Sequence, residues 1–478
     1  MEVNGIKAAG QHRRTRRPSN RPKRSVRHKR SVQRKPNRRA LTSRERYDAG
    51  YAEGYRQGME AGYGGYGSVF EGTSIIIPTY NQAEYLRQCI ESIADHTDLP
   101  YEIIVIDNAS TDGTADYLES VRGVVRHRIL PTNLGFAAAV NRGLMMAKGS
   151  TIVLLNNDTL VTDRWLDNML RCLMSDERIG MVGPVTNYIG GTQQIDVPYK
   201  SMQEMFAYAS ERNQSNPSSW MKTDRLVGFC LLFRRELWER TGYLDEGFRF
   251  GNFEDDDYNV RVRLQGYRLV IAQDAFIHHH GSVSTRALGD RLQEIYEGNE
   301  RYYGSKWGNP HALIHRVKQT MRLRTPEMPQ DEEALAAFNE ADFYPQFVIV
   351  RGIGDTAYWI ANGERRPITS PVQAPIVRLS MVELRRWRLG PEMSGEEAEA
   401  AWSRTGMEPD EQSGTLAYTP EGNPVYLEAG VVRPFASPRA SEAWGAAAKP
   451  AVQLTSEQLA ARQEGLPIIA PIRLEQAL

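Results

Sequence analysis

TIVLLNNDT, residues Thr151–Thr159, is the stretch of this 478-residue chain that decides its fold. Five apolar or β-branched residues predict a buried strand, which runs directly into two asparagines and Asp158. A carboxylate in this position lies at the carboxyl edge of a sheet, where open α/β folds bind their ligands. Its oxygens suit a hard divalent cation. Alternatively, Asp158 caps a helix that starts near Asp163.

Two stretches upstream have the same form. Residues 73–81, TSIIIPTYN, and residues 101–114, YEIIVIDNASTDGT, each predict a short strand that breaks into polar residues, with helical patterns over 83–96 and 114–121. Alternating strands and helices predict a parallel sheet with right-handed crossovers. Pro78 and Asp107 therefore fall at the same edge as Asp158. We expect an α/β fold with a mostly parallel sheet flanked by helices.

Six motifs in order resemble the family 2 inverting glycosyltransferases of the GT-A (Rossmann-like) fold, especially the rhamnosyltransferase-like branch. They are Pro78-Thr79-Tyr80-Asn81, residues 107–113, residues 133–137 with Asn141-Arg142-Gly143, Asn156-Asn157-Asp158, residues 253–257, and His279-His280-Gly281. The resemblance covers residues 73–307. It implies transfer from a nucleotide-sugar donor to a hydroxyl of a glycan or other surface-polymer acceptor, in cell-surface polysaccharide biosynthesis.

The resemblance also implies the residues that bind the donor. In the family, the position of Asp107 contacts the nucleobase; an Asx-turn with Ala109 and Ser110 is the alternative. A helix from Asn133 to Ala147 would aim its amino end at the donor, and Arg142 either contacts the phosphate or sugar or faces solvent. The full expected donor set is Pro78, Thr79, Tyr80, Asp107, Asn133, Gly135, Arg142, Asn156 and Asn157.

A cofactor, Mg²⁺ or Mn²⁺, is implied at Asp158 and His279. The family pattern is Asp-x-Asp, but this chain has Asn156 at the first position, so we expect a lower metal affinity. In the family a histidine two residues before Gly281 completes the metal site, which selects His279, with His278 as the second choice. His280 should point away because side chains alternate along an extended segment.

The expected catalytic base is Asp255, with Glu254 orienting the acceptor or the base. Four adjacent acids, residues 254–257, begin a helical pattern, and their mutual repulsion should raise at least one pKa. Alternatively, acids simply favour the first turn of a helix, which would explain Asp256 or Asp257. Gly228 and Phe229 are expected to form a wall beside the sugar.

The net charge of zero hides an asymmetry, because residues 1–50 hold 17 basic and 3 acidic side chains, a local charge of +14. We expect residues 1–70 to be a disordered tail. The tail either tethers the protein to a polyanion or an anionic membrane surface or forms a solvated arm. No secretory signal or membrane span is predicted. Three dispersed cysteines indicate a reduced, cytoplasmic protein, with association at the inner face of the membrane as an option.

An internal repeat follows the catalytic region. Residues 358–371 align with residues 425–438 at an offset of 67, and later positions align at an offset of 75. Asn362-Gly363 predicts a hairpin in the first copy. We expect a catalytic domain over residues 71–310, a helical linker over 311–345 and a two-copy hairpin–helix α+β module over 346–478. Whether the module binds a partner or is a structural appendage stays open.

Three other classes of protein share parts of this pattern. An inactive sugar- or nucleotide-binding scaffold of the same fold gains weight from Asn156 but loses more from the joint presence of Asp158, Asp255 and His279. A nucleotidyltransferase or a dinucleotide-binding dehydrogenase would need a glycine-rich loop after the first strand, and PTYNQAEY does not supply one.

Overall fold

The computed structural model describes residues 68–281, 291–324, 338–403, 414–428, 430–449 and 451–475. These residues belong to one compact unit. The basic tail expected over residues 1–70 lies outside the described residues up to Gly67, so its order stays a prediction. Within the described ranges, no helix has the length and apolar character needed to cross a membrane.

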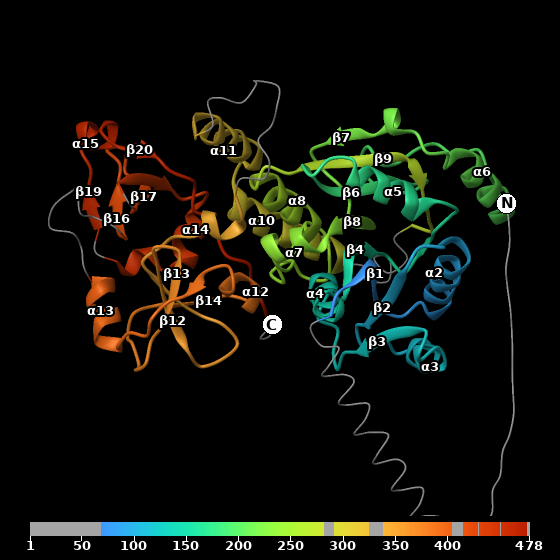
Figure 1. The fold of residues 1–478 in the computed structure, drawn as a ribbon, viewed down its shortest axis with the longest axis horizontal. Coiled ribbons are helices and arrows are strands. Elements are labelled where there is room, and N and C mark those ends of the chain that lie inside the picture. Colours follow the sequence, from blue (N-terminus) through green and yellow to red (C-terminus); the bar gives the residue numbers. More distant parts are fainter. Residues whose placement is uncertain are drawn as a thin grey trace, which may run out of the picture. The chain divides into compact units, whose positions relative to one another are not determined.

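The central sheet has eight strands in the order β3-β2-β1-β4-β8-β6-β9-β7 (Figure 1). All of these strands run parallel except β7 and β8, which are antiparallel to their neighbours. The mostly parallel α/β sheet predicted from the sequence is therefore confirmed. The strands are β1 (Phe70–Thr79), β2 (Tyr101–Asp107), β3 (Val125–Ile129), β4 (Gly149–Leu155), β6 (Ile179–Val185), β7 (Met221–Thr223), β8 (Cys230–Arg234) and β9 (Arg268–Phe276).

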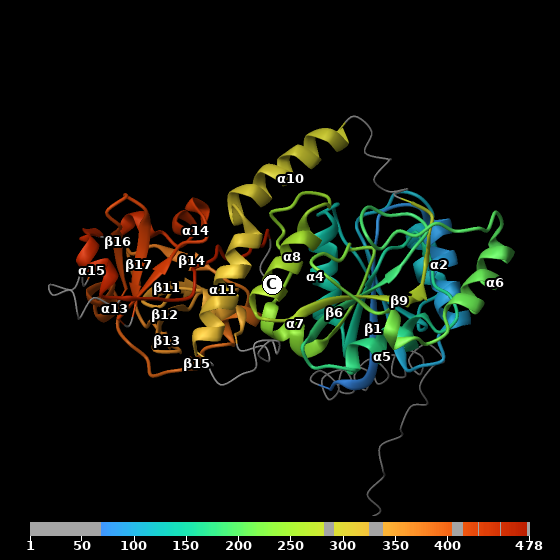
Figure 2. The ribbon, with the colours of Figure 1, turned by 90° about the horizontal axis from the view of Figure 1, so that it is seen from above.

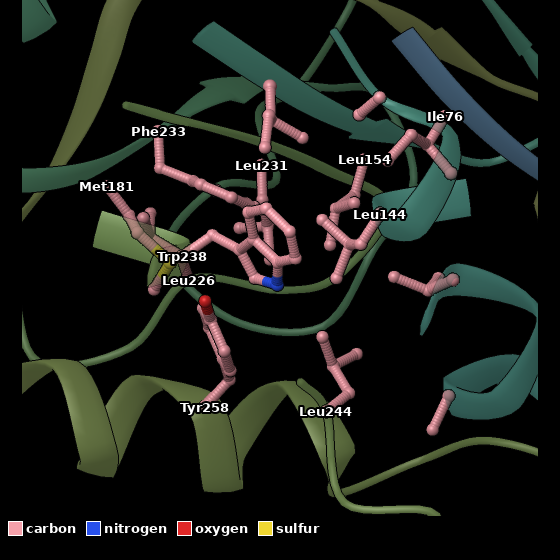
Figure 3. Close-up of a cluster of buried hydrophobic side chains, with 14 of the residues drawn as sticks. Ile76, Leu144, Leu154, Met181, Leu226, Leu231, Phe233, Trp238, Leu244 and Tyr258 are labelled. Atoms are coloured by element: carbon pink, nitrogen blue, oxygen red, sulfur yellow. The ribbon is translucent and has the colours of Figure 1, made fainter. Parts of the chain in front are cut away.

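Helices cover both faces of this sheet because its central strands are apolar on both sides. Ile75 and Ile77 of β1 pack with α2, α3 and α5, whereas Ile76 packs with α4, α7 and α8. Figure 3 shows the second of these cores around Trp238, Phe233 and Tyr258. The helices are α2 (Ala83–His96), α3 (Thr114–Ser120), α4 (Phe136–Met146), α5 (Trp165–Met174), α6 (Met202–Arg212), η1 (Pro217–Ser219), α7 (Arg235–Thr241) and α8 (Glu254–Leu264).

The helix expected from Asn133 begins three residues later. Gly135 has a φ of 87°, and the Asn133 side chain accepts a hydrogen bond from the Gly135 N–H. This turn directs the chain into α4 at Phe136. A further small sheet pairs β5 (Thr159–Leu160) with β10 (His278–His279).

Two helices follow the catalytic sheet: α10 (Arg291–Trp307) and α11 (Pro310–Arg324). Helix α8 lies beside them in both views (Figure 2). A short helix, η2 (Glu340–Phe343), then leads into the C-terminal part.

The C-terminal part contains two five-stranded sheets with the same strand order. The hairpin predicted at Asn362-Gly363 is confirmed, because β12 and β13 pair around these two residues, both with positive φ. The elements of the second sheet follow those of the first at the offsets of the sequence repeat. The first copy has β11 (Val348–Arg351), β12 (Ala357–Ala361), β13 (Glu364–Pro367), β14 (Ile376–Arg378), α12 (Met381–Leu384), β15 (Arg388–Leu389) and α13 (Gly395–Ser403). The second has β16 (Thr415–Tyr418), β17 (Pro424–Glu428), β18 (Val431–Pro434), α14 (Pro438–Ala443), η3 (Ala446–Ala448), β19 (Ala451–Gln453), α15 (Ser456–Ala460) and β20 (Gln463–Glu464).

Buried contacts join the C-terminal part to the catalytic sheet. Arg261 of α8 forms an ion pair with Glu340 of η2, at 2.5 Å, with both side chains almost fully buried. Ile472 packs in the same core as α4, and the Arg473 N–H donates to Asp245 Oδ1 at 3.0 Å. The C-terminal part therefore contacts α4, α8 and the loop that holds Asp245, which flank the central sheet.

Candidate active site

A cavity of about 300 Å³ lies where β1 and β4 end and where β8 and α8 begin. Parallel strands present the residues after their carboxyl ends at such an edge. The cavity is therefore formed by segments from both halves of the sheet. Its lining residues are Pro78, Thr79, Tyr80, Asn108, Asn133, Gly135, Phe136, Asn156, Asn157, Asp158, Ile189, Arg225, Val227, Gly228, Phe229, Phe250, Gly251, Asn252, Phe253, Glu254, Asp255, Asp256, His279 and Tyr296.

Hydrogen bonds connect the two residues after β4 with the last residue of β1 and with the residue before β8 at the floor of the cavity. The Asn157 side-chain amide donates to Thr79 Oγ1 at 2.8 Å, and the Asn156 N–H donates to the Phe229 carbonyl at 2.9 Å. Pro78 and Tyr80 line the cavity beside them. The backbone at these strand ends is thus fixed before any ligand binds.

Asp107 lies behind this floor rather than in the lining. Its Oδ1 accepts hydrogen bonds from the N–H and hydroxyl of Ser110, so the turn that the sequence offered as the alternative is present. Its Oδ2 is buried and has no hydrogen-bond donor among the described residues. A buried acceptor left unsatisfied costs free energy, and a nucleobase imide or amino N–H would satisfy it.

Asn108 holds the loop that opens α4, a function that sequence reasoning did not assign. Its amide donates to the Gly135 carbonyl at 2.9 Å and its oxygen accepts from the Leu134 N–H at 2.9 Å. A side chain at Gly135 would approach the backbone nitrogen of Phe250 to 3.0 Å. The positive φ and this close approach both require glycine.

Arg142 does not line the cavity, contrary to the expected donor contact. Its guanidinium is buried and lies 2.6 Å from Glu246 Oε1 and 2.8 Å from the Ala138 carbonyl. The solvent-facing alternative is also wrong. Helical periodicity places Arg142 on a face of α4 but does not identify its partner, which lies about a hundred residues away in the chain.

We therefore expect Arg142→Met to destabilise the fold, by about 3–5 kcal/mol, because it leaves Glu246 buried without its cation. Urea denaturation measures this loss in the free energy of unfolding, and Arg171→Met on the exposed face of α5 is the matched control. A variant with unchanged unfolding free energy but impaired nucleotide binding would instead place Arg142 at the donor.

Asp158 and His279 meet at the edge of the cavity. Pairing of β10 with β5 places His279 opposite Thr159, and His279 Nε2 lies 3.1 Å from Asp158 Oδ1. His279 Nδ1 lies 2.7 Å from the Tyr188 carbonyl, which can only accept, so Nδ1 carries the proton. In the neutral ring Nε2 is then a second acceptor facing a carboxylate oxygen. Two acceptors at this distance require a shared proton or a cation.

This donor set fits a divalent cation. A histidine whose other ring nitrogen donates to a backbone carbonyl is the usual arrangement of a metal ligand, and an Asp oxygen adds the hard ligand that Mg²⁺ or Mn²⁺ prefers. Within the described ranges, no group of three or more His, Cys, Asp or Glu side chains is arranged to hold a metal. A cation held by Asp158 and His279 would have positions left for oxygen ligands from the substrate or water.

The other two histidines of the run point elsewhere, as side-chain alternation predicts. His278 Nδ1 lies 2.7 Å from the Tyr199 hydroxyl, and burial lowers the pKa of His278 to about 4. The His280 ring packs against Tyr85 and His278. Phe229, expected beside the sugar, stacks on the His279 ring at 5.6 Å between centroids.

Asp255 lines the cavity from the first turn of α8. Its Oδ2 accepts from the Gly228 N–H at 2.8 Å and its Oδ1 from the Asp256 N–H at 2.9 Å. Burial, followed by repulsion from Asp256, raises the pKa of Asp255 to about 6. The main cause is thus burial and not the mutual repulsion of the four acids. A carboxylate with this pKa is ionised at neutral pH and can accept a proton.

The four acids of α8 differ in their surroundings. Burial raises the pKa of Glu254 well above its ordinary value, and its Oε2 has no hydrogen-bond donor among the described residues. Asp256 pairs with Arg225. Asp257 is buried beside Lys306 at 2.6 Å and accepts from the Trp307 indole at 2.8 Å. Asp257 is therefore part of the protein interior, and Glu254 and Asp255 are the two acids without a cationic partner in the cavity.

Several lining residues were missed at the level of sequence, among them Arg225, Phe250, Phe253 and Tyr296. Loop aromatics and single arginines carry no spacing pattern. Tyr296 does not stand out in the sequence either, because Ile295, Tyr303 and Trp307 lie on the same helix.

Residues 74–242 match the model of the family described as Glycosyl transferase family 2. The O-antigen biosynthesis protein RfbC of Myxococcus xanthus is 26% identical over 298 residues, covering 58% of this chain. This chain spans only 23% of the length of that relative. The N-acetylglucosaminyl-diphospho-decaprenol L-rhamnosyltransferase of Mycobacterium tuberculosis (strain ATCC 25618 / H37Rv) is 27% identical over 243 residues, covering 44% of this chain and 76% of that protein.

One similar solved structure is the mannosyltransferase PcManGT from Pyrobaculum calidifontis in complex with GDP-Man and Mn²⁺. It is 19% identical, has a TM-score of 0.34, and the similarity covers 54% of this chain and 82% of that chain.

Proposed function

The match over residues 74–242 makes this chain a member of glycosyl transferase family 2, and from that premise we propose that it is an inverting transferase. It would move a sugar from a nucleotide-sugar donor to a hydroxyl of a glycan or other surface-polymer acceptor. The observation that carries the proposal is one cavity lined both by an Asp158–His279 pair and by a buried carboxylate, Asp255.

The donor would lie over the floor formed by β1, β4 and the start of α4. The unsatisfied Asp107 Oδ2 supports a nucleobase N–H contact, and Thr79, Tyr80, Asn133 and Gly135 line the adjacent space. Asn156 and Asn157 would contact the ribose or the diphosphate. The amino end of α4 supports an anion here, because backbone N–H groups and the helix dipole favour negative charge.

Asp158 and His279 would hold Mg²⁺ or Mn²⁺ together with the donor diphosphate. When bound, the cation supplies positive charge that stabilises the departing diphosphate. Asn156 in place of an acid leaves Asp158 as the carboxylate of this motif, which supports a site completed by substrate oxygens.

On the acceptor side, Asp255 would remove the proton of the attacking hydroxyl. The acceptor oxygen bonds to the anomeric carbon as the bond from that carbon to the diphosphate oxygen breaks, and the proton passes to a carboxylate oxygen of Asp255. The Gly228 N–H orients this carboxylate. Glu254 would orient the acceptor hydroxyl.

A thermal-shift screen tests this proposal. Nucleoside diphosphates and nucleotide-sugars are added with Mn²⁺ or with EDTA, and we expect one base to raise Tm in a Mn²⁺-dependent way, because a ligand that binds the folded state stabilises it. No stabilisation by any nucleotide, in either condition, would contradict the proposed donor class.

The basic tail is proposed to bind a polyanion or an anionic membrane surface. The charge of +14 over residues 1–50 acts through attraction that salt screens. We expect the full chain to be retained on heparin and on anionic vesicles at low salt, and a form lacking residues 1–70 to be released while keeping its transfer activity. Equal retention of the two forms would leave the tail as a solvated arm.

A further inference from the structure

The loop before α8 has an unusual backbone. Phe250, Gly251, Asn252 and Phe253 all have positive φ, of 60°, 135°, 75° and 73°. Three of these are not glycine, and such conformations persist only where the surrounding structure holds them. This loop ends directly at Glu254 and Asp255, so its shape sets where the two carboxylates lie.

Asn299 of α10 holds this loop through four hydrogen bonds. Its buried amide nitrogen donates to the carbonyls of Arg249, Gly251 and Asn252, at 3.0, 2.8 and 3.2 Å, with one of its two hydrogens shared between two carbonyls, and its oxygen accepts from the Arg249 N–H at 2.9 Å. All four of these hydrogen bonds of the buried Asn299 side chain are made with residues 249–252.

Helix α10 also holds the other side of the acidic turn. Lys306 Nζ lies 2.6 Å from Asp257 and 2.6 Å from Asp245, with all three side chains buried. Helix α10 therefore holds the backbone both before and after Asp255. This helix lies outside the segment matched by the family model.

Tyr296, one turn before Asn299, lines the cavity and is 43% exposed. Its ring lies 5.1 Å from that of Phe253, and Phe250 lines the cavity nearby. The Arg225–Asp256 ion pair is also part of the lining. Aromatic rings beside charged hydrogen-bonding groups suit a pyranose, whose C–H face packs on a ring while its hydroxyls are bonded. A lipid chain would instead remove water from this ion pair without offering it any hydrogen bond.

We propose that α10 builds the acceptor side of the cavity, with Asn299 positioning the loop that delivers Asp255 and Tyr296 packing against a pyranose ring of the acceptor. This inference rests on the proposed transferase function. It assigns Asn299 and Tyr296 to the acceptor side of the cavity, and neither residue is part of the proposed donor site.

The test compares Tyr296→Ala, Tyr296→Phe, Asn299→Asp and the surface control Gln293→Ala. The probes are the nucleotide-sugar found in the screen and a panel of p-nitrophenyl glycosides as acceptors. We expect Tyr296→Ala to raise the acceptor KM about tenfold, the size of an aromatic contact, and Tyr296→Phe, which keeps the ring, to raise it by a smaller factor. Donor KM and Mn²⁺-dependent nucleotide binding should stay unchanged in all four variants.

Asn299→Asp keeps the shape and the acceptor oxygen but turns three donated bonds into contacts between oxygens. We expect kcat to fall about 100-fold, which is the effect of misplacing a catalytic group. The pH below which kcat/KM falls should also shift. A packing role alone would leave this isosteric variant near wild type. Unchanged acceptor kinetics in both Tyr296→Ala and Asn299→Asp would overturn this inference alone, whereas a wild type that binds no nucleotide would overturn the proposed function with it.

Discussion

Asp255→Asn should reduce transfer by on the order of 10²- to 10⁴-fold, the contribution of a positioned general base. Asparagine keeps an oxygen that can accept from the Gly228 N–H but cannot take up a proton. The donor side is built from other elements, so Mn²⁺-dependent nucleotide binding should stay close to that of the wild type. Calorimetry and single-turnover transfer on the same protein separate these two effects.

The pH dependence gives an independent check of the same residue. Because the pKa of Asp255 is raised to about 6, kcat/KM of the wild type should fall as pH drops through about 6. The raised pKa also means that the folded protein takes up a proton more readily than the unfolded chain. The stability associated with this group is present at low pH and is lost as pH rises through about 6. Asp255→Asn should therefore not lower the free energy of unfolding at neutral pH.

Glu254→Gln is the matched control for the acidic turn. Glu254→Gln should raise the acceptor KM but should change little the pH at which kcat/KM falls. Turnover of Asp255→Asn near the wild-type value would move the assignment of the base to Glu254, since Asp256 and Asp257 are paired with Arg225 and Lys306.

Asp158→Ala should weaken Mn²⁺-dependent nucleotide binding more than any other single change on the donor side. His279→Ala should weaken it less, because a neutral ring contributes no charge. We expect the Mn²⁺-dependent affinity for the nucleotide to fall on the order of 10- to 100-fold. In metal sites generally, losing a residue that only hydrogen-bonds a metal ligand already has an effect of this size. Calorimetry of a nucleoside diphosphate with Mn²⁺ and with EDTA measures the effect.

His278→Ala is the control for the histidine register. His278 is hydrogen-bonded to Tyr199 and faces away from Asp158, so its removal should leave metal-dependent binding unchanged. A loss with His278→Ala and none with His279→Ala would contradict the geometry of β10.

The ends of strands and the directions of side chains depend on local periodicity, so they could be predicted from the sequence. The carboxyl ends of parallel strands share one edge, so the positions of Pro78 and Asp158 followed from reading where apolar runs stop. His279 was selected by the family resemblance, whereas alternation along the segment predicted only that His280 points away. These features repeat every two or every 3.6 residues and are visible in a single chain.

Contacts between distant segments could not be predicted in this way. Arg142 seemed suited to a phosphate, but its partner Glu246 is set by packing of α4 against the segment before α8. The loop held by Asn299 has backbone angles that no spacing pattern encodes. The raised pKa of Asp255 was expected for the wrong reason, because burial depends on the cavity walls and not on adjacent acids.

The stereochemistry of the product tests the central claim most directly. Asp255 is proposed to deprotonate the acceptor hydroxyl, and Asp158 and His279 to hold the cation at the leaving diphosphate, so the acceptor oxygen would attack the anomeric carbon opposite to that diphosphate. A single displacement inverts that carbon, so the ¹H NMR coupling of the newly formed glycosidic bond should show a β-linkage from a donor with an α-linked diphosphate. A product with the configuration of the donor would contradict a single displacement and the assignment of Asp255 as its base.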